Sequence, residues 1–502
     1  MNNEDFFINL NIINLNIIRE IDMFIKSLCL SNFKGFVGDN HQINFKIPDG
    51  ETAGSGLNIF VGENNSGKSS IFEAVNFLRN GIKEDSVHLI KSKLANGNQP
   101  NDASVELTFC GNIEDSITYF VPANKQASFR NAISLNHELK AKRNTATCKR
   151  LDLWDSNAQN YTNPSGIDAP FKALFETNFI WADTNPNDEA SFGSTTLCGL
   201  LLKEIAQDHI NSDEYKAFQD SFNQVFNVPT SRLRQQISVI EQKVQRIFTE
   251  QFGQADIYFK FDELKIDSFF KNTSIFINDG VDIPMSEKGT GMQRSVALAL
   301  LQVYAEELAH DIEQNQIKPF YLFIDEPEVC LHPKGQTKLL EALLEISKIK
   351  QVFLTTHSPY FLATSHLKNV GLFIFRKNEI SNVIEDAMME PMFPWSPTWG
   401  EINFKAYKLP TVELHNELYG KLQHDSGEFR EHQFEQWLNN KGVIFSKQWI
   451  REQNGVALSP RNVTLQTFIR HHIHHPENNT MRAIPYTESE LKQSIEEMIR
   501  LL

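Results

Sequence analysis

The feature that most constrains this chain is a glycine-rich loop between an apolar run and a helical pattern. The loop, Gly62-Glu63-Asn64-Asn65-Ser66-Gly67-Lys68-Ser69, fits the pattern G-x-x-x-x-G-K-[ST]. Glycines let the backbone curl so that N–H groups face phosphate oxygens, while the lysine neutralises them and the hydroxyl holds Mg²⁺. We therefore predict a nucleotide site formed by Gly62, Asn64, Asn65, Ser66, Gly67, Lys68, Ser69 and Ser70.

A second apolar run, residues 320–324, ends in the acidic pair Asp325 and Glu326. At the end of a buried strand, Asp325 can organise Mg²⁺ together with Ser69, and Glu326 can accept a proton from an attacking water. Paired acids after a strand can also simply cap a loop. The phosphate loop in the same chain favours the catalytic interpretation.

A third apolar run, residues 352–354, leads through two threonines to His357. An imidazole beside a γ-phosphate can hydrogen-bond to it and respond to its presence. A lone histidine is ordinarily structural, but the order of phosphate loop, acidic pair and histidine favours a functional one. We predict Glu326 and His357 as catalytic residues, Ser69 and Asp325 as metal ligands, and ATP with Mg²⁺ as cofactors.

Composition sets broad limits on the chain. Its 502 residues are 41% hydrophobic and 22% charged, which is typical of globular proteins with more than one domain. A net charge of -15 argues against a wholly basic surface, yet it leaves a local nucleic-acid patch open. The five scattered cysteines favour reduced thiols and a cytoplasmic location. No uninterrupted apolar stretch reaches the roughly eighteen residues of a membrane helix.

The order of patterns predicts an α/β fold. Residues 23–385 are expected to form an ATPase domain with a mixed sheet, an antiparallel β-rich lobe and a helical insertion at about 195–255. Residues 386–502 are expected to form a small, mainly helical domain that ends in a helix with a capping box at Thr487 to Glu490. Residues 1–22 read as an extension, since asparagines interrupt their apolar run and Met23 offers a second start.

Several shorter segments are assigned by pattern alone. Alternating or apolar residues predict strands at 24–30, 32–36, 43–45, 104–109, 116–121, 257–261, 274–277 and 370–375. Heptad spacing in the insertion is carried by Leu233, Ile237, Ile240, Val244 and Ile247. We favour an amphipathic helix packed on its own domain, and a stub of a coiled-coil arm is the alternative.

These motifs together resemble the ABC-type ATPases, in the branch that contains the RecF, SMC and OLD proteins. The resemblance covers about residues 24–380 and is carried by the phosphate loop and by segments 30–36, 325–333 and 355–359. The family implies that two heads close on two ATP molecules as a homodimer or larger homo-oligomer. It also implies that each head offers a signature segment to the other's γ-phosphate.

The matching signature segment, residues 288–294, departs from the usual Leu-Ser-Gly-Gly-Gln. Gly289 stands where the serine is expected, and a hydroxyl of Ser286 or Thr290 is the candidate replacement. Backbone N–H groups at a helix start still favour phosphate. The resemblance therefore implies nucleotide contacts by Gly289, Gly291 and Gln293, with the hydrolysis rate in question.

A finer similarity is to ATPase subunits of bacterial antiphage systems, namely the PtuA-like ATPase of Septu and retron systems and that of PARIS. It is carried by segments 181–186, 288–294 and 473–478. The Toprim nuclease motifs of OLD proteins are not found after residue 380. The resemblance thus implies a regulatory or sensor ATPase in antiviral defence with a separate nuclease subunit, of HNH type if the chain is Septu-like.

Two alternative functions stay open. One is a RecF- or SMC-like DNA repair or recombination ATPase, for which the basic cluster Lys140, Lys142, Arg143, Lys149 and Arg150 is a candidate nucleic-acid contact, although a solvated hairpin edge is favoured. The other is a ribonuclease toxin using Arg470 and His475 as an R-x4-H motif. The histidine run 471–475 is also open to metal binding or, as favoured, to a structural or docking role.

Overall fold

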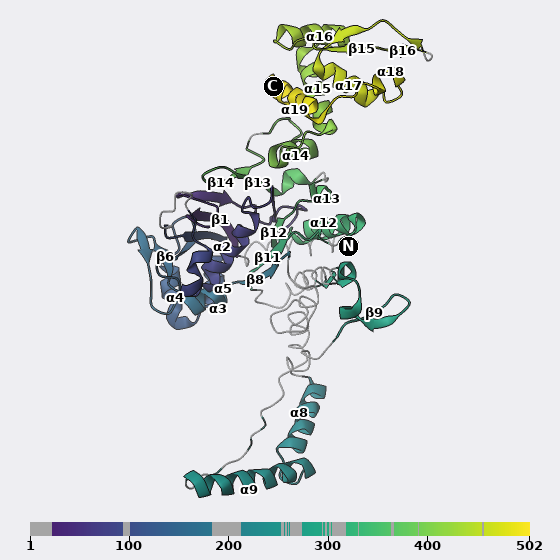
Figure 1. Cartoon of the computed structure of the whole chain (residues 1–502). Coiled ribbons are helices and arrows are strands. Elements are labelled where there is room, and N and C mark those ends of the chain that lie inside the picture. The colour runs from purple at the N-terminus through teal and green to yellow at the C-terminus, as the bar shows by residue number, and fades with distance from the viewer. Residues whose placement is uncertain are drawn as a thin grey trace, which may run out of the picture. The chain divides into compact units, whose positions relative to one another are not determined.

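The computed structural model describes residues 23–93, 101–182, 212–252, 274–293, 318–329, 331–362, 366–389, 391–453 and 456–502, with six single residues or pairs between 256 and 303. The internal contacts of the chain divide it into two units, whose helices and strands are labelled in Figure 1. Unit 1 comprises residues 1–182, 309–329 and 333–502, and unit 2 comprises residues 183–308 and 330–332. The predicted domain boundaries stay predictions, and the extension 1–22 lies outside the described residues.

A six-stranded mixed sheet in unit 1 carries the central motifs, with strand order β14-β13-β3-β12-β11-β8. Its five strands from β13 to β8 run parallel, and β14 pairs antiparallel with β13. Every residue of β3, β11 and β12 is buried, as expected for parallel strands covered on both faces. The strands are β3 (Leu57–Gly62), β8 (Glu176–Ile180), β11 (Phe320–Asp325), β12 (Gln351–Thr355), β13 (Gly371–Lys377) and β14 (Asn382–Asp386).

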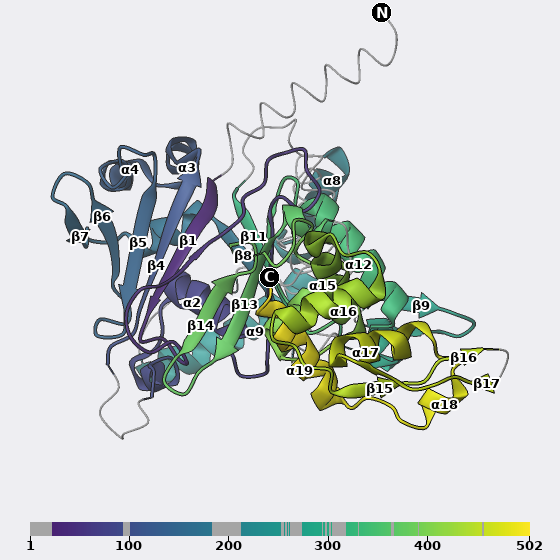
Figure 2. The same ribbon diagram turned by 90° about the horizontal axis from the view of Figure 1, so that it is seen from above.

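A six-stranded antiparallel sheet in the order β2-β1-β4-β5-β6-β7 forms the second layer of unit 1. Between the sheets lies α2 (Lys68–Asn80), which contacts β3 on one side and β4 and β5 on the other (Figure 2). One continuous apolar core fills this space. The strands are β1 (Met23–Ser31), β2 (His41–Asn44), β4 (Ser104–Gly111), β5 (Leu139–Asn144), β6 (Leu151–Asp155) and β7 (Asn160–Thr162).

Three strand predictions in unit 1 were wrong or incomplete. Residues 116–121 belong to a helix, α3 (Ile113–Phe120), because Ile113 and Ile117 share a buried face and Asn112 caps its start. Residues 32–36 form a tight turn with positive φ at Asn32 and Lys34, not a strand. The strand β14 was not expected after 375. Three more helices are α4 (Ala123–Arg130), α5 (Asp168–Leu174) and α12 (Pro333–Ile346).

Unit 2 contains the predicted helical insertion, described from residue 212 onward. Two helices, α8 (Asp213–Phe226) and α9 (Arg232–Phe252), contact each other. The heptad residues lie on α9, where Leu233, Ile240, Val244 and Ile247 are exposed, so the favoured packing against the insertion's own domain is not seen for these side chains. A hairpin of β9 (Phe276–Asn278) and β10 (Asp282–Pro284) follows. The predicted strand 257–261 falls mostly outside the described residues.

The C-terminal part of unit 1 is mainly helical, as predicted, and has its own apolar core. Four very short strands accompany its helices, and the capping box at Thr487 and Glu490 is confirmed. Among described residues, no helix has both the length and the apolarity to cross a membrane. The helices are α14 (Trp399–Tyr407), α15 (Val412–Ser426), α16 (Glu431–Asn440), α17 (Leu465–His474), α18 (Asn479–Arg482) and α19 (Glu488–Ile499), and the strands are β15 (Lys447–Trp449), β16 (Glu452–Gln453), β17 (Val456–Ala457) and β18 (Arg461–Val463).

The α/β class predicted from sequence is confirmed. The mixed sheet, the antiparallel lobe, the helical insertion and the mainly helical C-terminal part all occur. The carboxyl ends of β3, β11 and β12 lie at one edge of the mixed sheet, which is where ligands bind in open α/β sheets.

Candidate functional site

The phosphate loop needs glycine at both of its motif positions. Gly62 has φ 147°, and a Cβ there would lie 2.1 Å from the carbonyl oxygen of Phe375. Gly67 has φ 97°, and its Cβ would lie 2.8 Å from the Phe36 ring and 2.9 Å from Asn382 Nδ2. Any larger residue would both strain the backbone and collide with β13 or with the turn at 32–36. Asn64 and Asn65 at the tip of the loop are exposed.

Lys68 is the first residue of α2 and is buried. Its Nζ donates to the carbonyl oxygens of Gly62 and Glu63, at 3.0 Å each. Burial lowers the pKa of this ammonium group, and the nearby Glu326, Asp325 and Glu328 carboxylates oppose the shift. The loop therefore wraps around its own lysine, and the charge of that lysine faces the acidic side of the site.

Asp325 connects three elements of the site. Ser69 Oγ donates to Asp325 Oδ1 at 2.8 Å, and Thr355 Oγ1 donates to the same oxygen at 2.6 Å. Asp325 as a whole residue is 7% exposed. The Asp325 and Thr355 side chains meet because the parallel strands β11 and β12 pair these two residues in register. The two predicted metal ligands, Ser69 and Asp325, thus lie in direct contact.

Glu326 and His357 face each other across the ends of β11 and β12. Glu326 adopts a left-handed backbone, φ 46°, held by its N–H donating to Thr355 O and to Thr355 Oγ1. His357 Nε2 lies 3.4 Å from Glu326 Oε1, and the backbone N–H of His357 donates to Glu328 Oε1 at 2.6 Å. Burial and the Lys68 charge lower the pKa of His357, which keeps the imidazole neutral at pH 7.

Sequence reasoning missed three residues of this site. Thr355 orients Asp325, and the half-buried Glu328 accepts a hydrogen bond from the His357 backbone, with desolvation raising the pKa of its carboxyl group. Tyr407, on α14, donates its hydroxyl to the carbonyl oxygen of Thr356 at 3.3 Å. Thr355 and Glu328 lie within segments 355–359 and 325–333, which carry the family resemblance. Their position in these motifs could therefore have identified them as site residues. Nothing in the sequence placed Tyr407 here.

The donor set fits a magnesium nucleotide. The hydroxyl of Ser66 in the loop is buried without a hydrogen-bond partner, and so is Glu328 Oε2. A serine hydroxyl beside an aspartate carboxylate is the oxygen ligation that Mg²⁺ takes when nucleotide phosphates supply further ligands. Among described residues, no group of three or more His, Cys, Asp or Glu side chains could hold a metal ion without such help.

The signature segment, residues 288–294, lies in unit 2. Its helix begins at Thr290, and Gly289 faces open space where a Cβ would meet nothing within 4 Å. Gln293 is buried and donates to the carbonyl oxygens of Ser286 and Lys288, at 3.2 and 2.7 Å. The glutamine therefore shapes the loop rather than pointing outward. Arg294 lies outside the described residues.

The two C-terminal candidates for ribonuclease chemistry have separate partners. The guanidinium of Arg470 packs over the Tyr419 ring at 4.4 Å. His475 caps the end of α17, and its Nδ1 lies 3.1 Å from Glu477 Oε1. His471 stacks on the buried Trp449 at 4.7 Å. These contacts support the structural interpretation of the histidine run.

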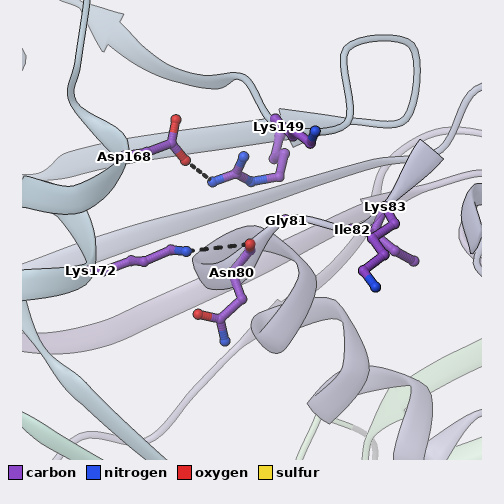
Figure 3. A pocket seen from close by; sticks show the side chains of 8 residues that line it. Asn80, Gly81, Ile82, Lys83, Lys149, Asp168 and Lys172 are labelled. Carbon is purple, nitrogen blue, oxygen red and sulfur yellow. Dashed lines mark hydrogen bonds and ion pairs between the residues drawn. The ribbon is translucent and has the colours of Figure 1, made fainter. Parts of the chain in front are cut away.

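The predicted basic cluster is only partly a surface feature. Arg143 is buried, donates to Leu78 O at 2.9 Å and pairs with Asp168 at 2.5 Å. Arg143 and the exposed Lys149 both line a pocket of about 480 Å³ at the end of α2, together with Lys83 and Lys172 (Figure 3). Lys172 reaches the Asn80 carbonyl oxygen at the C-terminus of α2, at 3.4 Å. The pocket carries more basic than acidic side chains.

Comparison with known proteins adds a family to this geometry. The family described as "AAA ATPase domain" matches residues 23–362. The Old nuclease of Escherichia phage P2 is 26% identical over 328 residues, which cover 62% of this chain and 54% of that protein. The chain thus spans about half the length of this curated relative.

Solved structures with a similar arrangement include two SMC heads. The SMC head bound to the C-winged helix domain of ScpA has a TM-score of 0.43 and 16% identity, covering 73% of this chain and 100% of that one. The SMC head domain from Thermotoga maritima has a TM-score of 0.34 and 18% identity, covering 72% of this chain and 98% of that one.

Proposed function

We propose that this chain, which belongs to the AAA ATPase domain family, is an ATPase whose nucleotide state controls a separate nuclease in bacterial antiviral defence. The ATPase activity follows from the family, and the regulatory role is our proposal. One observation carries the proposed ATPase mechanism: Ser69, Asp325, Glu326 and His357 converge beside Lys68 at one edge of the mixed sheet. This is the arrangement that phosphoryl transfer to water requires.

Each residue has a role that its surroundings support. When bound, ATP would supply the phosphoanhydride bond that is hydrolysed, and Mg²⁺ would supply positive charge that neutralises the phosphate oxygens. Lys68 would exchange its loop carbonyl partners for phosphate oxygens, and Ser69 with Asp325 would hold the metal. Glu326 would take the proton of the attacking water. The neutral His357 can donate one hydrogen bond toward a phosphate oxygen without adding charge.

The second half of the site is proposed to come from another copy of the chain. Gly289 faces open space just before a helix that begins at Thr290, so the backbone N–H groups of Gly289 and Gly291 would be available to a phosphate. The backbone N–H of Gln293 already donates to Gly289 O at 3.1 Å, so Gln293 would contribute by shaping this loop. A homodimer or larger homo-oligomer in the cytoplasm is the corresponding assembly. The altered signature predicts slow turnover, as a regulator would show.

Substitution of Glu326 by Gln tests the site. The variant should bind ATP normally, because the amide keeps the size of the side chain, and should lose about 100-fold or more in turnover. Size-exclusion chromatography with ATP should show a trapped dimer. Glu341→Gln, on an exposed part of α12, is the matched control and should behave like the wild type. Normal turnover in Glu326→Gln would remove Glu326 from the mechanism.

The nuclease partner is supported by the Old nuclease relative and by the segments that resemble the Septu ATPase. The test is to purify the chain alone and with the product of a neighbouring HNH gene, then measure DNA cleavage with and without ATP. Cleavage only in the pair, altered by Glu326→Gln, supports the proposal. Cleavage by the chain alone would contradict it.

A RecF- or SMC-like role in DNA repair is the second candidate, and the basic pocket in Figure 3 favours it. Phosphate contacts make binding fall steeply with salt, so duplex DNA affinity should be measured across a salt series. Lys83→Glu with Lys149→Glu should abolish such binding, whereas Lys492→Glu on α19 should not. Tight binding by the chain without any partner would favour repair over regulation.

A further inference from the structure

The helix α14 joins the nucleotide site to the C-terminal core. It lies beyond residues 23–362, which the family description matches, yet it contacts β3 and β13 of the mixed sheet. Arg376 on β13 donates from Nε to the carbonyl oxygen of Lys405, at 3.1 Å. The helix is therefore fastened to the strand that neighbours the phosphate loop.

Tyr407, the last residue of α14, contacts His357. The Tyr407 ring centroid lies 5.9 Å from that of His357, with the rings inclined by 38°. The Tyr407 hydroxyl donates to the carbonyl oxygen of Thr356, the residue before His357, at 3.3 Å. Burial raises the pKa of Tyr407 above its usual range, and the Glu328 and Glu326 carboxylates add to the rise. The hydroxyl therefore stays protonated and remains a donor.

The other side of α14 belongs to the C-terminal core. Phe404, one turn before Tyr407, packs in that core with Leu414 and Leu418. Thr398, the N-cap of α14, donates to Glu417 Oε2 on α15 at 2.7 Å. Gly400 lies so close to α15 that a Cβ would come within 2.8 Å of Leu414 N. Movement of α14 would consequently move α15.

We propose that Tyr407 is a positioning residue that holds His357 in place, and that α14 thereby transmits the state of the nucleotide site to the C-terminal core. Close packing on both sides of one short helix is the physical basis, since packed elements shift as units rather than deform continuously. The inference rests on the proposed role of His357 in the ATPase.

The test separates the Tyr407 ring from its hydroxyl. Tyr407→Phe keeps the ring and should retain kcat within about fivefold, which is the factor that corresponds to the roughly 1 kcal/mol of one neutral hydrogen bond. Tyr407→Ala removes the contact with His357 and should lower kcat at least tenfold with little change in KM for ATP. Tyr419→Phe is the matched control. It removes another buried hydroxyl, which is hydrogen-bonded to Thr467 at 3.0 Å and not to the segment around His357.

Hydrogen exchange gives a readout independent of turnover. Without ATP, Tyr407→Ala should speed amide exchange at 355–358, while Tyr419→Phe leaves it unchanged. With ATP, exchange in 399–426 should slow in the wild type and not in Tyr407→Ala. Unchanged exchange and unchanged kcat in Tyr407→Ala would overturn the proposal, and if that variant does not fold, Tyr407→Leu takes its place. If His357→Ala shows normal turnover while Tyr407→Ala shows altered exchange, the proposed role of His357 in ATP hydrolysis is rejected. The conclusion that Tyr407 positions the segment around His357 then still holds.

Discussion

Replacing Thr355 by Val should disable the metal site while leaving the fold intact. The hydroxyl donates to Asp325 Oδ1 at 2.6 Å and accepts from the Glu326 N–H at 3.0 Å, with Thr355 fully buried. Valine has nearly the same shape, so packing is kept. A hydrogen bond to a charged group contributes about 1.5–3 kcal/mol, and the Glu326 N–H retains the Thr355 carbonyl oxygen. We therefore expect unfolding free energy to fall by about 2 kcal/mol.

The functional effect of Thr355→Val should be larger than its effect on stability. Loss of a group that orients a metal ligand typically weakens metal affinity about 10- to 100-fold. The Mg²⁺ concentration that gives half-maximal turnover should therefore rise by about that factor. The assay is ATP hydrolysis at fixed ATP across a Mg²⁺ series, paired with urea unfolding. Thr355→Ser keeps the hydroxyl and should resemble the wild type. If Thr355→Val shows the native Mg²⁺ dependence, the role of Thr355 in orienting Asp325 is refuted.

Three further perturbations test other parts of the structure. Burial lowers the pKa of His415 to about 3, below the unfolded value of about 6.5, so stability should fall by up to about 1.4 kcal/mol per pH unit as pH drops from 6.5 toward 3, and His415→Gln should flatten this slope in urea unfolding. Arg143→Met should cost about 2 kcal/mol in unfolding free energy, whereas the exposed Arg150→Met should cost under about 1. Gly67→Ala should abolish ATP binding in calorimetry, and normal binding would contradict the contacts with Phe36 and Asn382.

Local sequence was a good guide where one element carried the signal. The strand, glycine loop and helix at 57–80 were predicted because strand burial, loop chemistry and helical period agree within a short stretch. Residues 116–121 were misassigned because alternation over six residues is also compatible with a helix whose buried positions are four apart. The burial of Arg143 could not be foreseen, since its partners Leu78 and Asp168 are distant in sequence.

The sequence by itself determined the parts of the site: the phosphate loop, the acidic pair at Asp325 and Glu326, and the histidine after a third buried strand. Each is encoded by residue types whose chemistry is local. The tertiary structure decided how these parts are held. Strand register placed Thr355 against Asp325, the turn after β11 placed Glu328 against the His357 backbone, and the packing of α14 placed Tyr407 against the His357 ring. Such contacts depend on parallel pairing and helix packing between distant segments, which no local pattern specifies.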